Sequence, residues 1–130
     1  MKKVVIIGGG FAGALCAKKL EKDFLVTLID NKDYFEFTPG ILRTIIDPSH
    51  AKSVQIKHSN YLKQAKFLNE RVKSISKTQV ITSKRKMDFD YLVIASGSRY
   101  ASPIKESDIV YATRSKTLAH YHNKLEKLQL

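Results

Sequence analysis

The sequence has one cysteine, no tryptophan, three prolines and six glycines in 130 residues. A single cysteine, Cys16, excludes an internal disulfide, a Cys-x-x-Cys redox pair and any metal site built from several cysteines. We expect it to pack in the core as a small apolar residue. Hydrophobic residues make up 43% of the chain, but no apolar run approaches the ~20 residues of a membrane-spanning helix. The composition therefore indicates a globular protein that is soluble or lies on a membrane surface.

Acidic residues are also scarce, because 12 Asp and Glu stand against 23 Lys and Arg, giving a formal net charge of +11. The excess is local, since residues 52–86 contain ten basic residues and one acidic residue. Such a segment could bind nucleic acid or an anionic membrane surface. Apart from the run Lys84-Arg85-Lys86, however, its basic residues stand singly among apolar and small ones. This pattern favours a solvated face and disfavours nucleic acid as a partner.

Four of the six glycines lie together near the N-terminus, in the run Gly8-Gly9-Gly10-Phe11-Ala12-Gly13. The apolar residues before this run predict a strand over 3–8, and those after it predict a helix over 11–22. A glycine turn between a strand and a helix lets the backbone approach a pyrophosphate, and the free N–H groups of the helix favour its charge. The motif therefore predicts a dinucleotide site.

An acid at the right distance strengthens this interpretation. A second apolar run over 25–30 predicts a strand that ends at Asp30, 20 residues after Gly10, where a carboxylate can bind a ribose hydroxyl. Two simpler interpretations are weaker. A secretory signal peptide would have a similar basic start and apolar centre, but three consecutive glycines and the pair Lys18-Lys19 interrupt it. A plain glycine turn would not need the acid.

The remaining chain predicts a mixed α/β domain. Residues 31–50 read as a long structured connection with a short helix over 40–46, and long ordered connections are often functional. An almost wholly apolar strand over 91–95 suits the centre of a parallel sheet. The other predicted elements are an amphipathic helix over 56–64, a hairpin of strands 66–76 and 79–83, a strand over 109–112 and a helix from about residue 115.

Four segments carry a family resemblance: residues 4–13, 28–30 (Leu-Ile-Asp), 32–43 (Lys-Asp-Tyr-Phe-Glu-Phe-Thr-Pro-Gly-Ile-Leu-Arg) and 89–98. The last runs from a strand into Ala-Ser-Gly, where the family usually has Ala-Thr-Gly. Together they resemble the first half of the FAD domain of pyridine nucleotide-disulfide oxidoreductases, with most similarity to type II NADH dehydrogenases and apoptosis-inducing-factor-like flavoproteins. The resemblance implies a Rossmann-like three-layer α/β domain over residues 1–130, with a parallel sheet and a hairpin or meander, incomplete at its C-terminus.

The resemblance also implies a set of FAD-binding residues. The glycine loop would lie at the pyrophosphate, Asp30 with Asn31 or Lys32 at the adenosine ribose, and the main chain of Val72 at the adenine. Arg43 corresponds to an arginine that reaches the cofactor, although a surface position is an equal alternative. The predicted cofactor-binding residues are Gly8, Gly9, Gly10, Phe11, Ala12, Gly13, Asp30, Asn31, Lys32, Arg43, Val72, Ala95, Ser96 and Gly97.

The remaining candidate residues do not form a predicted metal or catalytic site. The histidines at 50, 58, 120 and 122 are scattered, so we predict no metal site and no catalytic side chain. Ser96 and Ser98 lack the context of a hydrolase nucleophile. The aromatic residues Tyr34, Phe35 and Phe37 could shield a flavin, but packing over the sheet is their default role.

Two functions remain open. The first is the FAD-binding portion of an NAD(P)H-dependent oxidoreductase resembling an NADH dehydrogenase, with a quinone as electron acceptor. The second is a non-catalytic nucleotide-binding or assembly module derived from such an enzyme. Because the resembled family places NADH on a second domain, we expect the isolated chain to be inactive and to be a fragment, a split-gene product or a shortened form. The expected partner is a second copy or another chain that completes the sheet, in the cytoplasm or peripheral to a membrane.

Overall fold

A computed structural model of the chain describes residues 1–98, 122, 126 and 127. The chain divides into two compact units, each described here by itself. The first unit comprises Met1–Phe35 and Lys57–Gly97, and the second comprises Glu36–Ile56 with the described residues from Ser98 onward. The predicted strand over 109–112 and most of the predicted final helix lie outside the described residues.

A four-stranded parallel sheet forms the centre of the first unit, in the order β5-β2-β1-β9. Helix α1 (Phe11–Leu20) connects its two middle strands, because parallel neighbours need a crossover between them. The register pairs Ile7 of one middle strand with Ile29 of the other, so both end at the same edge. The parallel sheet is therefore confirmed, and its strands are β1 (Lys3–Ile7), β2 (Leu25–Asp30), β5 (Lys66–Asn69) and β9 (Tyr91–Ile94). The central position predicted for the strand over 91–95 is wrong, because among the described residues β9 lies at the edge of the sheet and pairs with β1 alone.

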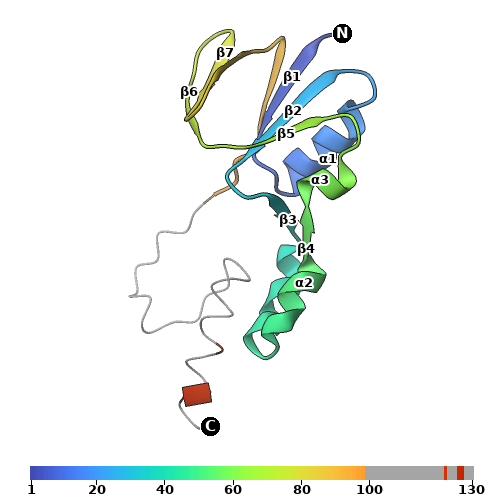
Figure 1. Ribbon diagram of the computed structural model, residues 1–130, viewed down its shortest axis with the longest axis vertical. Coiled ribbons are helices and arrows are strands. Elements are labelled where there is room, and N and C mark those ends of the chain that lie inside the picture. Colours follow the sequence, from blue (N-terminus) through green and yellow to red (C-terminus); the bar gives the residue numbers. More distant parts are fainter. Residues whose placement is uncertain (99–121, 123–125, 128–130) are drawn as a thin grey trace. The chain divides into compact units, whose positions relative to one another are not determined.

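Two hydrophobic cores cover the two faces of this sheet, because side chains alternate along each strand. Figure 1 shows α1 and α3 beside the sheet and the β6–β7 hairpin on the other side of it. Cys16 packs against the helical core, as expected. The helical core contains Val4, Ile6, Ala17, Val26, Leu28 and Leu62, and the opposite core contains Val5, Ile29, Leu68 and Val80.

The second core lies under a three-stranded antiparallel meander of β6 (Val72–Ile75), β7 (Gln79–Thr82) and β8 (Lys86–Asp88). The predicted single strand over 66–76 is wrong, since it divides into β5 and β6, which belong to different sheets. The chain turns at buried Glu70, whose carboxylate accepts a hydrogen bond from Thr82 Oγ1 at 2.6 Å and pairs with Arg85 Nη2 at 2.7 Å. This tertiary anchor interrupts a pattern that otherwise alternates as one strand does.

The predicted amphipathic helix over 56–64 is also wrong. The segment contains strand β4 (Gln55–Lys57), which pairs with β3 (Tyr34–Glu36), followed by the single helical turn α3 (His58–Tyr61). The backbone N–H of His58 donates to the Asp33 carbonyl at 3.0 Å. His58 is thus bonded to a residue outside the segment, and its side chain is fully buried. Both contacts favour a single turn over a longer helix.

The second unit is built from short helices around a small core of Ile41 and Val54. The predicted short helix over 40–46 is present as the 3-10 helix η1 (Thr38–Ile45), with Pro39 in its first turn. Helices η2 (Pro48–His50) and α2 (Ala51–Val54) follow it. His122 Nδ1 donates to the Ile45 carbonyl at 2.6 Å.

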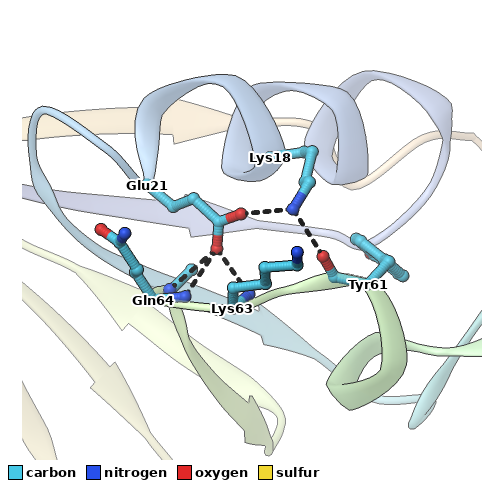
Figure 2. A network of polar contacts seen from close by, with 6 residues as sticks. Lys18, Glu21, Tyr61, Lys63 and Gln64 are labelled. Atoms are coloured by element: carbon cyan, nitrogen blue, oxygen red, sulfur yellow. Dashed lines mark hydrogen bonds and ion pairs between the residues drawn. The ribbon is translucent and has the colours of Figure 1, made fainter.

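A buried carboxylate anchors α1 to the chain that enters β5 (Figure 2). Glu21 follows α1 directly and is 4% exposed. Its Oε1 forms an ion pair with Lys18 Nζ at 2.7 Å. Its other oxygen accepts hydrogen bonds from the backbone N–H groups of residues 63, 64 and 65, at 2.8, 2.8 and 3.1 Å. Burial alone would raise the Glu21 pKa, but Lys18 and the three N–H groups outweigh burial and lower the pKa from 4.5 to about 2.

Candidate functional site

The predicted glycine loop lies where the parallel strands end at their carboxyl edge. Gly8 N donates to the Ile29 carbonyl, and Ala95 N donates to the Ile7 carbonyl, both at 2.8 Å. These two bonds continue the hydrogen-bond pairing of β1 with β2 and with β9 by one residue beyond the strands. The glycine loop therefore starts between the ends of β2 and β9, which carry Asp30 and Ala95. Open α/β sheets bind ligands outside this edge.

Packing explains two of the loop glycines. Gly8 has a φ of +99°, and a Cβ on it would lie 2.3 Å from the carbonyl oxygen of Ala95. A Cβ on Gly13 would lie 1.8 Å from the carbonyl oxygen of Gly8, because the first turn of α1 crosses directly over the loop. Both positions therefore need glycine for the fold itself.

Gly10 is different. It is the N-cap of α1, its φ of −75° suits any L-residue, and a Cβ placed on it would meet no atom within 4 Å. Its backbone is exposed beside the first turn of a ten-residue helix, where the free N–H groups attract an anion. Neither packing nor a left-handed backbone requires glycine here; glycine is a favoured N-cap, and its missing side chain also leaves the backbone open to a ligand.

Asp30 lies at the end of β2 and is 8% exposed. Its Oδ2 lies 3.2 Å from Nε2 of His58, and the Nδ1 of that ring lies 2.6 Å from the Tyr61 hydroxyl. Burial would raise the Asp30 pKa, but the hydrogen bond from His58 and the charge of Lys32 outweigh it and hold the pKa below its usual range. The carboxylate is therefore ionised at neutral pH and accepts hydrogen bonds.

A cleft of about 330 Å³ opens at this edge of the first unit. Predicted residues on its walls are Gly8, Asp30, Asn31, Val72 and Ser96. Ile75, Ile94 and Arg71 add apolar and basic surface. The cleft thus combines the first glycine of the loop, an ionised carboxylate and apolar walls, which together suit the phosphate, ribose and base of a nucleotide.

Other predicted residues lie around the same edge or elsewhere. Gly97 follows β9 with a φ of +73°, so its glycine is needed for the backbone. Phe11 packs edge-on against Phe35 with ring centroids 5.0 Å apart, and Lys32 Nζ lies 5.1 Å from the ring centre of buried Tyr34. Gly9 is buried and Ala12 is exposed on α1. Arg43 is exposed on η1 in the second unit, so its predicted phosphate contact stays a prediction.

Sequence reasoning missed His58 and Tyr61, which the fold brings to Asp30 from α3. In the sequence His58 is one of four scattered histidines, because 28 positions separate it from its carboxylate partner. The sequence does contain one signal of this contact. His58 and Tyr61 are polar residues three positions apart within the predicted amphipathic helix. Their carboxylate partner could be identified only in three dimensions.

A larger cleft of about 490 Å³ lies at the opposite ends of the strands. Its walls include Lys3, Leu25 and Lys66, the first residues of three strands. No glycine lines it, and nucleotides bind at the carboxyl ends of strands in such sheets. We therefore place the candidate site at the smaller cleft.

Within residues 1–98, 122, 126 and 127, no group of three or more His, Cys, Asp and Glu side chains could hold a metal ion. Among the same residues, no helix has the length and apolar character needed to span a membrane.

Comparison with known proteins agrees with this geometry. The family model of the pyridine nucleotide-disulphide oxidoreductases matches residues 2–129. Apoptosis-inducing factor homolog B of Dictyostelium discoideum is 35% identical over 123 residues, covering 94% of this chain and 32% of that protein. Apoptosis-inducing factor homolog A of the same organism is 40% identical over 105 residues, covering 80% of this chain and 26% of that protein.

Solved structures show the same fold. The sulfide:quinone oxidoreductase of Aquifex aeolicus superposes with a TM-score of 0.83 at 26% identity, covering 99% of this chain and 32% of that one. NDH2 from Plasmodium falciparum gives a TM-score of 0.86 at 22% identity, covering 99% and 30%. The chain therefore spans about a third of the length of these proteins. The resemblance found in the sequence is confirmed: the chain belongs to the pyridine nucleotide-disulphide oxidoreductases, a family that binds FAD and NAD(P)H.

Proposed function

We propose that the chain is the partial FAD-binding domain of an NAD(P)H-dependent flavoprotein oxidoreductase, and that the cleft beside the glycine loop holds the ADP end of FAD. The observation that carries this proposal is Gly10, which has open space beside its Cα and a conformation that does not require glycine. The family, whose members bind FAD and NAD(P)H, supports the same assignment.

Each wall of the cleft has a role in this proposal. The loop N–H groups at the start of α1 bind the pyrophosphate, with the dipole of that helix adding to their attraction. Ionised Asp30 accepts hydrogen bonds from the ribose hydroxyls. The main chain of Val72 and the side chain of Ile75 border the adenine. Arg43 lies in the second unit, so its contact with a phosphate stays a prediction from the resemblance.

The redox chemistry would come from the flavin, which accepts a hydride from a nicotinamide and passes electrons to an acceptor. The described side chains bind and orient the nucleotide end of the cofactor. We propose a quinone as the acceptor, because one relative that is 33% identical over 106 residues is a sulfide-quinone reductase of Aquifex aeolicus. The match covers only 25% of the length of that protein. The electron acceptor is therefore tested directly, by measuring reduction of soluble quinones. We propose a cytoplasmic or membrane-peripheral location for the protein.

Replacing Gly10 by alanine tests the site. We expect the melting temperature to fall by no more than about 5 °C, because the new methyl group meets no protein atom and the only loss is that of a better N-cap residue. FAD affinity should fall at least about tenfold, since a methyl group at the loop keeps the backbone from the pyrophosphate. Quenching of flavin fluorescence on titration with FAD measures the affinity, and circular dichroism measures the melting temperature.

Lys19→Ala is the matched control, because Lys19 is exposed on the same helix but away from its N-terminus. This variant should bind FAD as the unmodified chain does. Equal FAD affinity of Gly10→Ala and the unmodified chain would contradict the site. Binding of ADP without FAD would instead favour a nucleotide-binding module without redox function.

We further propose that a second copy or another chain pairs along β9. Among the described residues, β9 pairs only with β1, and its Tyr91 and Ile94 side chains are 55% and 63% exposed. Exposed apolar residues on an edge strand promote pairing with another strand. Native mass spectrometry of the purified chain should show dimers or larger species that increase with concentration, and a monomer at all concentrations would exclude self-pairing.

A further inference from the structure

Three polar side chains form a line beneath the glycine loop. The Tyr61 hydroxyl lies 2.6 Å from His58 Nδ1, and His58 Nε2 lies 3.2 Å from Asp30 Oδ2. His58 is fully buried, with its ring tilted against Phe67 at 4.8 Å between centroids. A fully buried imidazole with polar partners on both nitrogens is held in one orientation.

The protonation of the two ends fixes the direction of these hydrogen bonds. Burial, with a smaller effect of the Asp30 charge, raises the pKa of Tyr61 to about 12, so its phenol keeps a proton that it can donate. Asp30 is ionised and can only accept. In the neutral ring, Tyr61 therefore donates to Nδ1, and Nε2–H donates to the carboxylate.

The line is also packed against the loop. A Cβ on Gly9 would lie 2.4 Å from Cε1 of His58 and 2.5 Å from Oδ2 of Asp30. Tyr61 is fixed from the other side, because its backbone carbonyl accepts a hydrogen bond from Lys18 Nζ at 2.8 Å (Figure 2). The loop, Asp30 and α1 thus share one set of contacts that passes through His58.

We infer that His58 is a positioning residue for nucleotide binding, holding Oδ2 of Asp30 so that the carboxylate keeps one orientation and its remaining acceptor sites serve the ribose hydroxyls. Tyr61 supports this role by fixing the proton on Nε2. The inference rests on the proposed function, since it concerns how Asp30 recognises the ribose. A binding group held by a buried partner loses less freedom on binding than an unsupported one does.

A merely structural role for His58 is the competing explanation. Such a role would lower stability, and with it the affinity for all nucleotides alike, when His58 is changed. A positioning role affects recognition of the ribose hydroxyls in particular. The two are separated by the ratio of affinities for ADP and for ADP analogues that lack the 2′- or the 3′-hydroxyl.

Isothermal titration of the full chain with FAD, ADP, 2′-deoxy-ADP and 3′-deoxy-ADP measures this ratio. We expect the unmodified chain to prefer ADP over at least one deoxy analogue by about tenfold, a typical effect of one hydrogen bond to a charged group. His58→Leu should reduce the preference to about threefold or less. His58→Gln should keep most of it, because a glutamine Nε2 can donate to the same oxygen.

Two further variants complete the test. Asp30→Asn should abolish the preference, and adding His58→Leu to it should then have no further effect on the ratio. Tyr61→Phe removes only the hydroxyl and keeps the ring, so it gives the answer if His58→Leu does not fold. It should lower the preference about two- to threefold.

Unchanged preference in folded His58→Leu, or in Tyr61→Phe when His58→Leu does not fold, would overturn the inference. So would an equal loss of preference in His58→Gln and His58→Leu. Failure of the unmodified chain to bind FAD and ADP would be a different result, because it would reject the proposed function itself.

Discussion

Gly13→Ala is expected to destabilise the first unit by at least about 3 kcal/mol, the range of severe overpacking, and to abolish FAD binding with it. The new Cβ would lie 1.8 Å from the carbonyl oxygen of Gly8 and 2.9 Å from its carbonyl carbon. Both are backbone atoms, so the loop or the helix would have to move. Urea unfolding followed by circular dichroism measures the loss of stability.

The sign of this effect separates tertiary packing from helix propensity. Gly13 lies inside α1, where alanine by itself would stabilise a helix by about 1 kcal/mol relative to glycine. Gly10→Ala introduces the same methyl group three residues earlier, where it meets no atom within 4 Å. A Gly13→Ala variant as stable as Gly10→Ala would show that α1 does not cross the loop as described.

Glu21→Gln is expected to cost about 3 kcal/mol of unfolding free energy at pH 7. The buried carboxylate has four partners, Lys18 and the N–H groups of residues 63–65. A neutral amide cannot attract Lys18 and directs an NH₂ group toward one set of these donors. The anchor between α1 and the chain entering β5 should then loosen, which denaturant unfolding measures.

This loss should depend on pH with a defined sign. The pKa of Glu21 is lowered on folding from 4.5 to about 2, so its ionisation stabilises the folded chain above about pH 4.5, and this contribution disappears as the pH falls through about 2. The difference in unfolding free energy between the unmodified chain and Glu21→Gln should therefore be constant from pH 5 to 7. It should shrink steadily below pH 4.

Asp23→Asn provides the matched control, because Asp23 is an exposed carboxylate two residues away. Its effect should stay within about 0.5 kcal/mol at neutral pH. If Glu21→Gln cost no more than Asp23→Asn, or if its cost were the same at pH 3 as at pH 7, the buried carboxylate would not be the anchor described here.

Local patterns in the sequence were sufficient for the elements that carry the glycine motif. Strand β1, helix α1 and strand β2 follow from an apolar run, a glycine turn and a second apolar run that ends at Asp30. Strand β9 also follows from an almost wholly apolar run, but it lies at the edge of the described sheet and not at its centre. In these segments the periodicity of the side chains and the tertiary environment favour the same structure.

Prediction failed where long-range contacts decide the structure. Residues 66–76 alternate like one strand, but buried Glu70 pairs with Arg85 and Thr82, and this anchor moves the following residues into a second sheet. Residues 56–64 have a helical pattern, but burial of His58 beside Asp30 leaves only one helical turn. Charged and polar groups buried with distant partners give no local periodic signal.

The sequence by itself determined the glycine loop and the acid at the end of the second strand, because strand, turn and acid have fixed spacings along the chain, and four of its segments carried the family resemblance. The tertiary structure alone decided the different reasons for the loop glycines. Gly8 and Gly13 serve packing, Gly9 lies against His58 and Asp30, and a Cβ on Gly10 would meet no protein atom within 4 Å. The physical reason is that a glycine's role depends on which atoms surround its missing Cβ, and those atoms come from β9, α3 and the end of β2.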